Sequence, residues 1–215
     1  MKLYDCSRRI FEGAAAFPGD EPFKFNTLKR VADGDLVNLT SILIGSHQGT
    51  HVDSPYHWIE DGKKLDEMDL SCYCGECRLI EIADKDIITK ADLEPYQPQK
   101  GEILLVKTKN SEESDEAPFH LGFVGFDYEA GQYLADCGVK TIGIDYLSIE
   151  GGTKEGVEAE RHAHQPVLGA GMAIIEGLYF SRDIKPGNYF IAALPLKVTA
   201  AEGSPVRAVL IDFNK

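Results

Sequence analysis

Four side chains that could bind a metal ion lie close together near residue 50 of this 215-residue chain: His47, His51, Asp53 and His57. All four occupy odd positions. On an extended chain, whose successive side chains alternate between two faces, they would therefore project to the same side. A helix would keep His47 and His51 on one face but would turn the other two away. The glycine, β-branched residues and proline between them also disfavour a helix interior, so we expect residues 47–57 to form an irregular strand.

Imidazole and carboxylate groups together suit Zn²⁺, with manganese and iron as harder alternatives. The helical metalloprotease motif His-Glu-x-x-His does not fit, because Gln48 stands where that motif needs a glutamate to act as base. A chance grouping of surface or core histidines is the other alternative. Three histidines and an aspartate on one face favour a metal site over chance.

The spacing of these residues resembles the signature of a known family. Residues 47–57 read His-x-Gly-Thr-His-x-Asp-x-Pro-x-His, which is similar to the hallmark of the cyclase-like metal-dependent hydrolases, a family that includes bacterial kynurenine formamidase and isatin hydrolase. The resemblance implies a swivelling β/β/α fold. It implies that His57 is catalytic, as a proton shuttle, and not an essential metal ligand. It also places Phe17, in Phe17-Pro18-Gly19-Asp20, at the mouth of the active site, where this side chain would line the substrate pocket.

The resemblance further implies two ligands from the last third of the chain, a histidine and a glutamate twelve positions later. His164 and Glu176 have this spacing, whereas His162 fits it less well and is expected behind the ligands or at the surface. Glu176 follows a run of apolar residues, so its carboxylate is expected inside the protein, where it needs a cation or a hydrogen-bond partner. A salt bridge to a lysine or arginine is the alternative. His120 is expected to be an ordinary loop histidine.

The resulting metal ligands are His47, His51, Asp53, His164 and Glu176. Five ligands exceed what one tetrahedral zinc ion with an open position requires. By resemblance, the formamidase branch of the family holds two ions that share the aspartate, and other branches hold one. We therefore expect one or two Zn²⁺ ions, with Mn²⁺ as the alternative.

The pattern of apolar residues predicts a single α/β domain over residues 1–215, with a mixed sheet or barrel-like core and flanking helices. Strands are expected at residues 36–45, 77–82, 102–108, 140–145, 189–194 and 206–213, a short helix near 89–93, and a longer helix at 127–137. The strand, helix and strand between residues 102 and 145 are typical of a parallel crossover unit.

Composition narrows the classes of partner. A formal net charge of −13 and the lack of a basic stripe disfavour nucleic acid. No apolar run reaches the roughly 18 residues of a membrane span, and the N-terminus does not have the apolar segment of a signal peptide. Five cysteines, an odd number, indicate reduced thiols, so we expect a cytoplasmic protein. Cys72, Cys74 and Cys77 could form a thiolate zinc site, but a closed site needs four ligands, and small apolar residues entering a strand are the preferred interpretation.

The expected function is hydrolysis of a non-peptide C–N bond in a small-molecule amide, with N-formylkynurenine as the leading substrate. A cyclic amide of the isatin type or a lactone is the alternative within the family. A metal-binding protein without catalysis is an alternative from another class. Lys109, Asn110 and Tyr146 depart from the family pattern, which leaves the substrate open. Because members of the family associate, we expect a homodimer or homotetramer.

Overall fold

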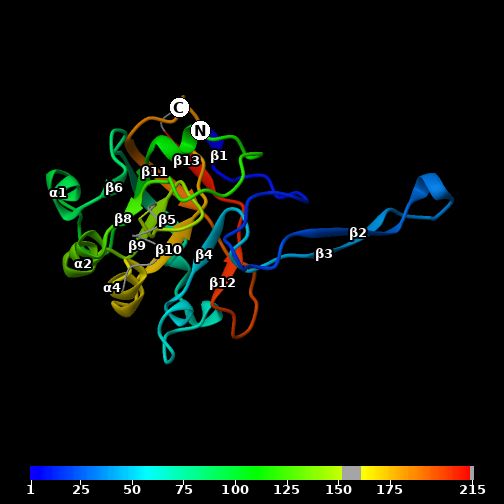
Figure 1. Cartoon of the computed structure of the whole chain (residues 1–215), viewed down its shortest axis with the longest axis horizontal. Coiled ribbons are helices and arrows are strands. Elements are labelled where there is room, and N and C mark those ends of the chain that lie inside the picture. Colours follow the sequence, from blue (N-terminus) through cyan, green and yellow to red (C-terminus); the bar gives the residue numbers. More distant parts are fainter. Residues whose placement is uncertain (152–160, 214–215) are drawn as a thin grey trace.

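The computed structural model describes residues 1–151 and 161–213, and a curled nine-stranded sheet is its central feature (Figure 1). Across the sheet, the strands are β1 (Lys2–Asp5), β13 (Val209–Asp212), β11 (Gly187–Ala192), β5 (Cys74–Glu81), β7 (Ile103–Lys107), β9 (Thr141–Ile144), β10 (Ala173–Glu176), β4 (His51–Asp53) and β12 (Gly203–Pro205). The pairs from β5 to β10 are parallel and the others are antiparallel. The prediction of a mixed α/β fold is therefore confirmed.

The parallel part of the sheet follows from the predicted crossover unit. All five residues of β7 are buried, as expected of a strand with both faces covered. Helix α2 (Tyr128–Cys137) connects β7 to the parallel strand β9. The Asp127 side chain accepts a hydrogen bond from the backbone N–H of Ala130, which caps the first turn, and Gly138 ends the helix in the left-handed conformation.

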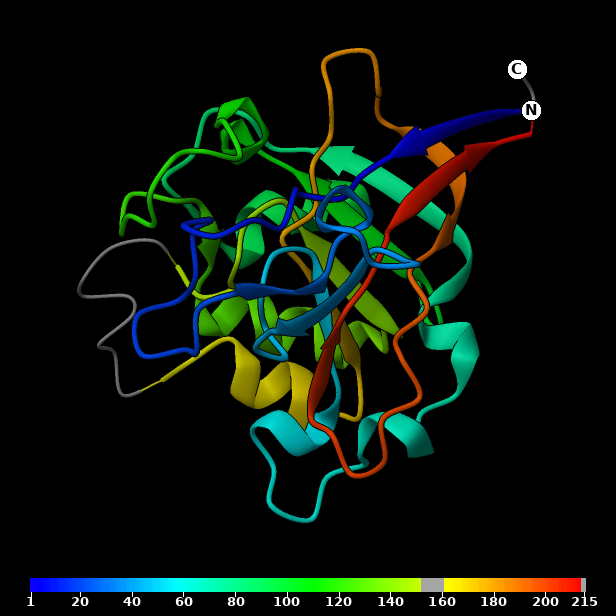
Figure 2. The ribbon, with the colours of Figure 1, turned by 90° about the vertical axis from the view of Figure 1, so that its right-hand side faces the viewer.

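Short elements complete the described chain. They are the α-helices α1 (Lys90–Leu93) and α4 (His164–Gly169), the strand pair β6 (Ile87–Ile88) and β8 (Gly125–Phe126), and the 3₁₀ helices η1 (Val31–Asp33), η2 (Pro55–His57), η3 (Leu65–Glu67), η4 (Leu70–Cys72), η5 (Glu94–Tyr96) and η6 (Lys109–Glu112). No helix among the described residues is long and apolar enough to cross a membrane. β1 and β13 lie side by side, so the first and the last described strands meet at one edge of the sheet (Figure 2).

The two faces of the sheet support separate cores. One core lies between the sheet and the helices and includes Leu104, Ile142 and Ile174, and the other occupies the opposite face and includes Val52 and Ile175. Successive side chains of a strand point to opposite faces. Since Val52 and Ile175 face away from the helices, their neighbours in sequence, the predicted ligands of β4 and β10, lie on the helix-covered face.

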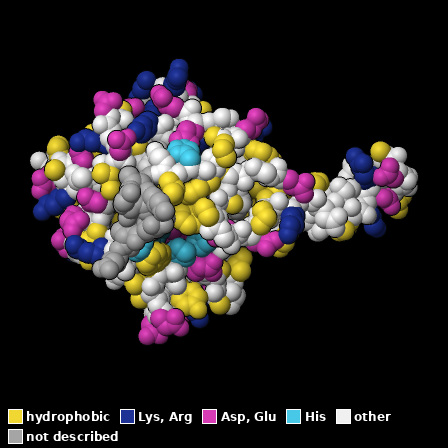
Figure 3. Space-filling model, viewed as in Figure 1, with side chains coloured by type: hydrophobic (Ala, Val, Ile, Leu, Met, Phe, Trp, Pro, Cys, Tyr) yellow, Lys and Arg dark blue, Asp and Glu magenta, His cyan; other side chains and the backbone are white. Residues whose placement is uncertain are grey.

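A hairpin stands apart from this body. Its strands are β2 (Lys24–Lys29) and β3 (Leu39–Leu43), which pair only with each other among the described strands. Figure 1 shows this arm projecting far from the sheet, and the space-filling view shows it standing clear of the body (Figure 3). The strand predicted at residues 36–45 is thus present but shorter, and it belongs to the arm and not to the main sheet.

Candidate metal centre

Residues 47–57 reach the centre by a strand and two turns. Only His51, Val52 and Asp53 form a strand, β4, while His47 lies in the turn before it and His57 ends the 3₁₀ helix η2. The prediction of one irregular strand is therefore wrong. Gly49, with a φ of 67°, turns the chain ahead of β4, and a proline begins η2 after it. Alternation along a strand explains the shared direction of His51 and Asp53 alone.

The register of β4 with its two neighbours assembles the centre. In the antiparallel pair with β10, Glu176 lies opposite His51, and directly opposed side chains of a sheet share a face. On the other side, β12 places Gly203 opposite Asp53. A Cβ atom at Gly203 would lie 2.8 Å from Cε1 of His47 and 3.0 Å from the carbonyl oxygen of Val52. Position 203 therefore needs a glycine for the His47 ring to come this close.

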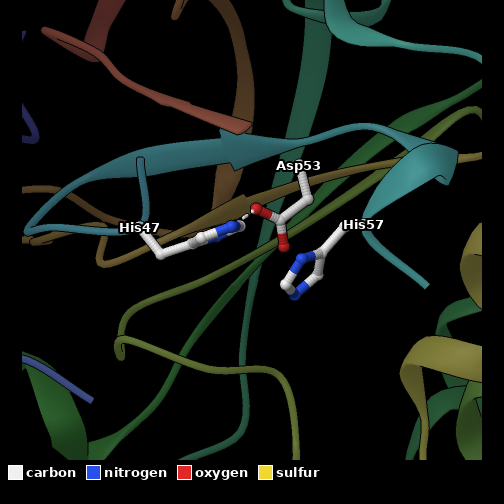
Figure 4. A group of neighbouring side chains, drawn as sticks. All are labelled: His47, Asp53 and His57. Carbon is white, nitrogen blue, oxygen red and sulfur yellow. Dashed lines mark ion pairs between the residues drawn. The ribbon is translucent and has the colours of Figure 1, made fainter. Parts of the chain in front are cut away.

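The predicted ligands meet around the carboxylate of Asp53. His47 Nδ1 lies 2.9 Å from Asp53 Oδ1, and His51 Nε2 lies 3.0 Å from Glu176 Oε2. His51 Nε2 also lies 3.7 Å from Asp53 Oδ1. Figure 4 shows the imidazoles of His47 and His57 both beside the carboxylate of Asp53, and their ring centroids are 4.2 Å apart.

Helix α4 delivers His164 to the same place. Its Nε2 atom lies 3.3 Å from Glu176 Oε1 and 3.7 Å from Asp53 Oδ2. His164 is 4% exposed and Glu176 is 3% exposed, so the expectation of an interior glutamate is confirmed and a surface salt bridge is not what holds it. The structure thus brings together all five predicted ligands, from β4, the turn before it, α4 and β10.

The charges of the centre depend on one another. Burial opposes the charge on His47, but the carboxylates of Asp53, Glu176 and Glu202 together outweigh burial and raise the pKa of His47 to about 9. Burial also opposes the charge on His164, and the three carboxylates around it nevertheless raise its pKa well above the usual value. Burial lowers the pKa of His57, and attraction to Asp53 does not reverse that shift. Two adjacent buried carboxylates therefore demand positive charge, which protons or a metal cation can supply.

The donor atoms of the centre lie close together, but several of them make no hydrogen bond within the described structure, as expected of atoms that bind a metal cation. Within residues 1–151 and 161–213, the buried polar atoms with no hydrogen-bond partner include Nε2 of His47, His51 and His164 and both carboxylate oxygens of Asp53. In the same residues, two groups have mutually close ligand atoms, His47 with Asp53 and His57, and His51 with Asp53 and Glu176. Asp53 is common to both groups, and neither contains a cysteine.

The remaining predicted residues occupy less central positions. Cys72 and Cys77 are buried, and all five cysteines are free. Nδ1 of His162 lies 3.3 Å from a carboxylate oxygen of Glu150, behind His164. His120 is a half-buried loop residue, and its position in a loop was predicted; its Nε2 lies 2.9 Å from Glu113 Oε1. Phe17 packs edge-on against Phe119, at 5.2 Å between ring centroids, and its role in a substrate pocket stays a prediction.

Three residues around the centre were not found from the sequence. Glu150 contacts His164, Glu202 lies 3.4 Å from His47 Nε2, and Trp58 stacks on His164 with ring centroids 5.3 Å apart and planes 11° apart. Glu150 and Glu202 lie outside any motif, so only the tertiary structure reveals them. Trp58 directly follows His57, and its place beside a histidine-rich turn was the one available signal.

Comparison with known proteins identifies relatives of this chain. Residues 4–151 match the family model Cyclase, described as "Putative cyclase". The chain is 34% identical over 206 residues to the kynurenine formamidase of Geobacillus thermodenitrificans, covering 96% of this chain and 95% of that protein. It superposes with a TM-score of 0.82 on a structure titled "predicted metal-dependent hydrolase" from Bacillus stearothermophilus, which is 33% identical, with 97% of each chain covered. Isatin hydrolase A from Ralstonia solanacearum, 21% identical, shares the fold with a TM-score of 0.85 over 98% of this chain and 92% of its own. The chain belongs to the cyclase family.

Proposed function

We propose that this protein is a metal-dependent hydrolase that cleaves a non-peptide C–N bond in a small-molecule amide, with N-formylkynurenine as the leading substrate and kynurenine and formate as products. The observation that carries the proposal is the convergence of Nε2 of His51 and His164 with the carboxylates of Asp53 and Glu176, in a buried site where several donor atoms have no other partner. The identity to kynurenine formamidases over nearly the full chain supports the choice of substrate.

His47, His51, Asp53, His164 and Glu176 would hold the metal, as one or two zinc ions or, alternatively, manganese. Asp53 belongs to both groups of candidate ligands, so the described residues would offer enough donor atoms for two ions. A bound divalent ion supplies Lewis acidity, which activates water and polarises the amide carbonyl.

His57 is the group we assign to proton transfer. Its lowered pKa keeps the imidazole neutral near pH 7, so it can accept a proton when water adds to the carbonyl carbon. As the C–N bond breaks, the same imidazole can return that proton to the departing nitrogen. The products are then the neutral amine and the carboxylic acid, with the histidine restored.

The test combines metal analysis of the purified protein with a panel of N-formylkynurenine, a cyclic amide and a lactone. We expect bound zinc or manganese, loss of turnover on chelation, and the highest kcat/KM on the formamide. Preferred turnover of the cyclic amide or the lactone would move the substrate to the isatin type or to lactones. Bound metal without turnover of any of the three would instead favour a metal-binding protein that is not a catalyst.

We further propose that residues 1–215 act as one cyclase-like domain in the cytoplasm, consistent with the pairing of β1 with β13 and with five free cysteines. We propose that it assembles as a homodimer or homotetramer through the β2–β3 arm. A two-stranded hairpin is marginally stable alone, and this one exposes eight large apolar side chains: Phe25, Leu28, Val31, Leu36, Val37, Leu39, Ile42 and Leu43. A second copy of the chain would cover them.

A further inference from the structure

Glu150 lies directly behind the metal centre on a segment with a fixed backbone. It is 6% exposed, and it forms a parallel bridge with Phe126, whose N–H donates to the carbonyl of Ile149 at 2.7 Å. A Cβ atom at Gly125 would lie 2.0 Å from the carbonyl oxygen of Glu150, so the two backbones are in direct contact. The position of the Glu150 carboxylate is therefore set by the body of the protein.

Both oxygens of this carboxylate point at the beginning of α4. Oε1 contacts Nδ1 of His164 and lies 3.2 Å from the backbone N of the same residue. Oε2 lies 3.2 Å from the backbone N of Ala163 and 3.3 Å from Nδ1 of His162. One buried side chain thus holds both the backbone and the ring of His164.

We propose that Glu150 is the positioning residue of His164 in the metal site proposed above, on which this inference rests. An ionised carboxylate accepts hydrogen bonds but cannot donate them. The proton shared between Glu150 and His164 is therefore donated by Nδ1 of His164. With a cation bound, Nε2 would offer its lone pair to that cation; in the described structure this atom lies near Asp53 and Glu176 and has no hydrogen-bond partner. Such an outer carboxylate fixes the tautomer and orientation of a ligating histidine and increases its basicity as a ligand.

The neighbouring residue reinforces the arrangement. The backbone N–H of Ile149 donates to Glu176 Oε1 at 2.6 Å, so the segment that holds His164 also holds Glu176. That contact is made by the backbone and cannot be removed by replacing a side chain. The Glu150 side chain is therefore the part of this segment that mutation can test.

The other two imidazoles have weaker outer partners. His51 Nδ1 lies 2.9 Å from the neutral carbonyl oxygen of Gly49. His47 Nε2 lies 3.4 Å from Glu202, whose side chain is 35% exposed. Because Glu150 is both charged and buried, its interaction with His164 is less screened by solvent, and its loss should weaken metal binding more than loss of Glu202.

The experiment is a double-mutant cycle on the full-length protein, with zinc affinity measured by competition with a chromophoric chelator. Glu150→Gln keeps the size of the side chain and removes its charge, and we expect a 10–100-fold weaker affinity. In a His164→Ala background, Glu150→Gln should have no further effect, because Glu150 acts through His164. Glu94→Gln, at an exposed carboxylate paired with Lys90, is the matched control and should match the wild type.

Provided that the wild type binds zinc, two results would overturn the inference. One is an unchanged zinc affinity in Glu150→Gln, and the other is an equal loss of zinc affinity when Glu150→Gln is added to His164→Ala. A wild-type protein without zinc affinity would instead overturn the proposed metal site. If Glu150→Gln fails to fold, Glu150→Asp takes its place in the cycle. Asp retains the charge on a shorter side chain, so the same pattern is expected with a smaller loss, and an equal loss in both backgrounds would again contradict the inference.

Discussion

The metal centre and the β2–β3 arm both depart from the usual distribution of side chains, in which polar groups are exposed and apolar groups are buried, but they do so in opposite ways. In the centre, polar groups are buried: His51 and Asp53 have no exposed surface. In the arm, apolar groups are exposed, and Leu36 keeps 98% of its surface accessible. Buried polar groups and exposed apolar patches are the informative exceptions to the usual distribution. Each indicates a partner of matching chemistry, a cation for the centre and an apolar surface for the arm.

The two regions also differ in how they are supported. The centre draws on β4, β10, β12 and α4, and its side chains are held by contacts between residues far apart in the sequence. The strands of the arm pair only with each other among the described strands. Without its cation, the centre should therefore stay folded but hold buried carboxylates whose charge is not balanced. Without a second copy of the chain, the arm should have no tertiary support.

The largest expected effect concerns Asp53, the residue common to both candidate ligand groups. Asp53→Ala should abolish metal binding and reduce kcat/KM by more than about 100-fold, the upper range for loss of an outer partner of a ligand. Metal analysis and turnover of the best substrate check this. Full metal content in Asp53→Ala would contradict the assignment of a cation to the centre.

His57 separates metal binding from catalysis. His57→Ala should keep most of its metal but lose roughly 100-fold or more in kcat, the usual contribution of a positioned acid–base group. His51→Ala, the control, should lose metal and activity together. His57 also belongs to one of the candidate ligand groups. If His57→Ala loses its metal as His51→Ala does, His57 is a ligand, and near wild-type turnover would exclude the proton-transfer role.

The stability of the metal-free protein should fall as pH rises from about 6.5 to 9. The pKa of His47 is about 9 in the fold and near 6.5 in an unfolded chain. A group with a raised pKa stabilises the fold fully below its unfolded pKa, and this contribution disappears as pH rises through the folded value. The His47 contribution is about 3 kcal/mol, and the raised pKa of His164 acts in the same direction.

With zinc bound, the imidazoles are ligands and carry no extra proton to lose. Denaturant unfolding at pH 6.5, 8 and 9.5, with chelator or with zinc, measures the difference. His47→Gln should flatten part of the decline of the metal-free protein. If the free energy of unfolding fell equally with pH in the zinc-loaded and metal-free proteins, the prediction would be wrong, because bound zinc would then not replace the protons that balance the buried carboxylates.

The sequence predicted the parts of the molecule that depend on local pattern. The strands at 77–82, 102–108, 140–145, 189–194 and 206–213 are present as β5, β7, β9, β11 and β13 with shifted ends, and the helix at 127–137 is α2. The apolar runs and capping residues of these elements are local sequence signals, so the elements can be predicted without knowledge of the tertiary structure. The spacing of residues 47–57 also predicted a grouping of His47, His51 and Asp53, which the structure brings together, although its interpretation as one strand was wrong. Their role as metal ligands stays a prediction.

What the sequence could not supply was contact between distant segments. Glu150 and Glu202 reach the histidines only because of the bridge to Phe126 and the pairing of β12 with β4. The strand at β3 was predicted, but not that it would leave the sheet. The apolar residues of β3 predict a strand that packs against another surface. The sequence of one chain does not say whether that surface belongs to the same copy or to another.

The last prediction concerns Leu36 near the tip of the arm. Because 98% of its surface is exposed, Leu36→Asp has almost no contact to lose within one copy, so any effect on assembly reports on the partner. Burying a leucine contributes about 1.5–3 kcal/mol, and a two-fold dimer would bury it twice. Sedimentation across a concentration series should therefore show dissociation at more than about 100-fold higher concentration than for the wild type. Leu70→Asp, at a 62% exposed leucine on the body, is the control and should assemble normally. A monomeric wild type at micromolar concentration, or equal assembly of both variants, would mean that the arm does not dock on a second copy through its tip.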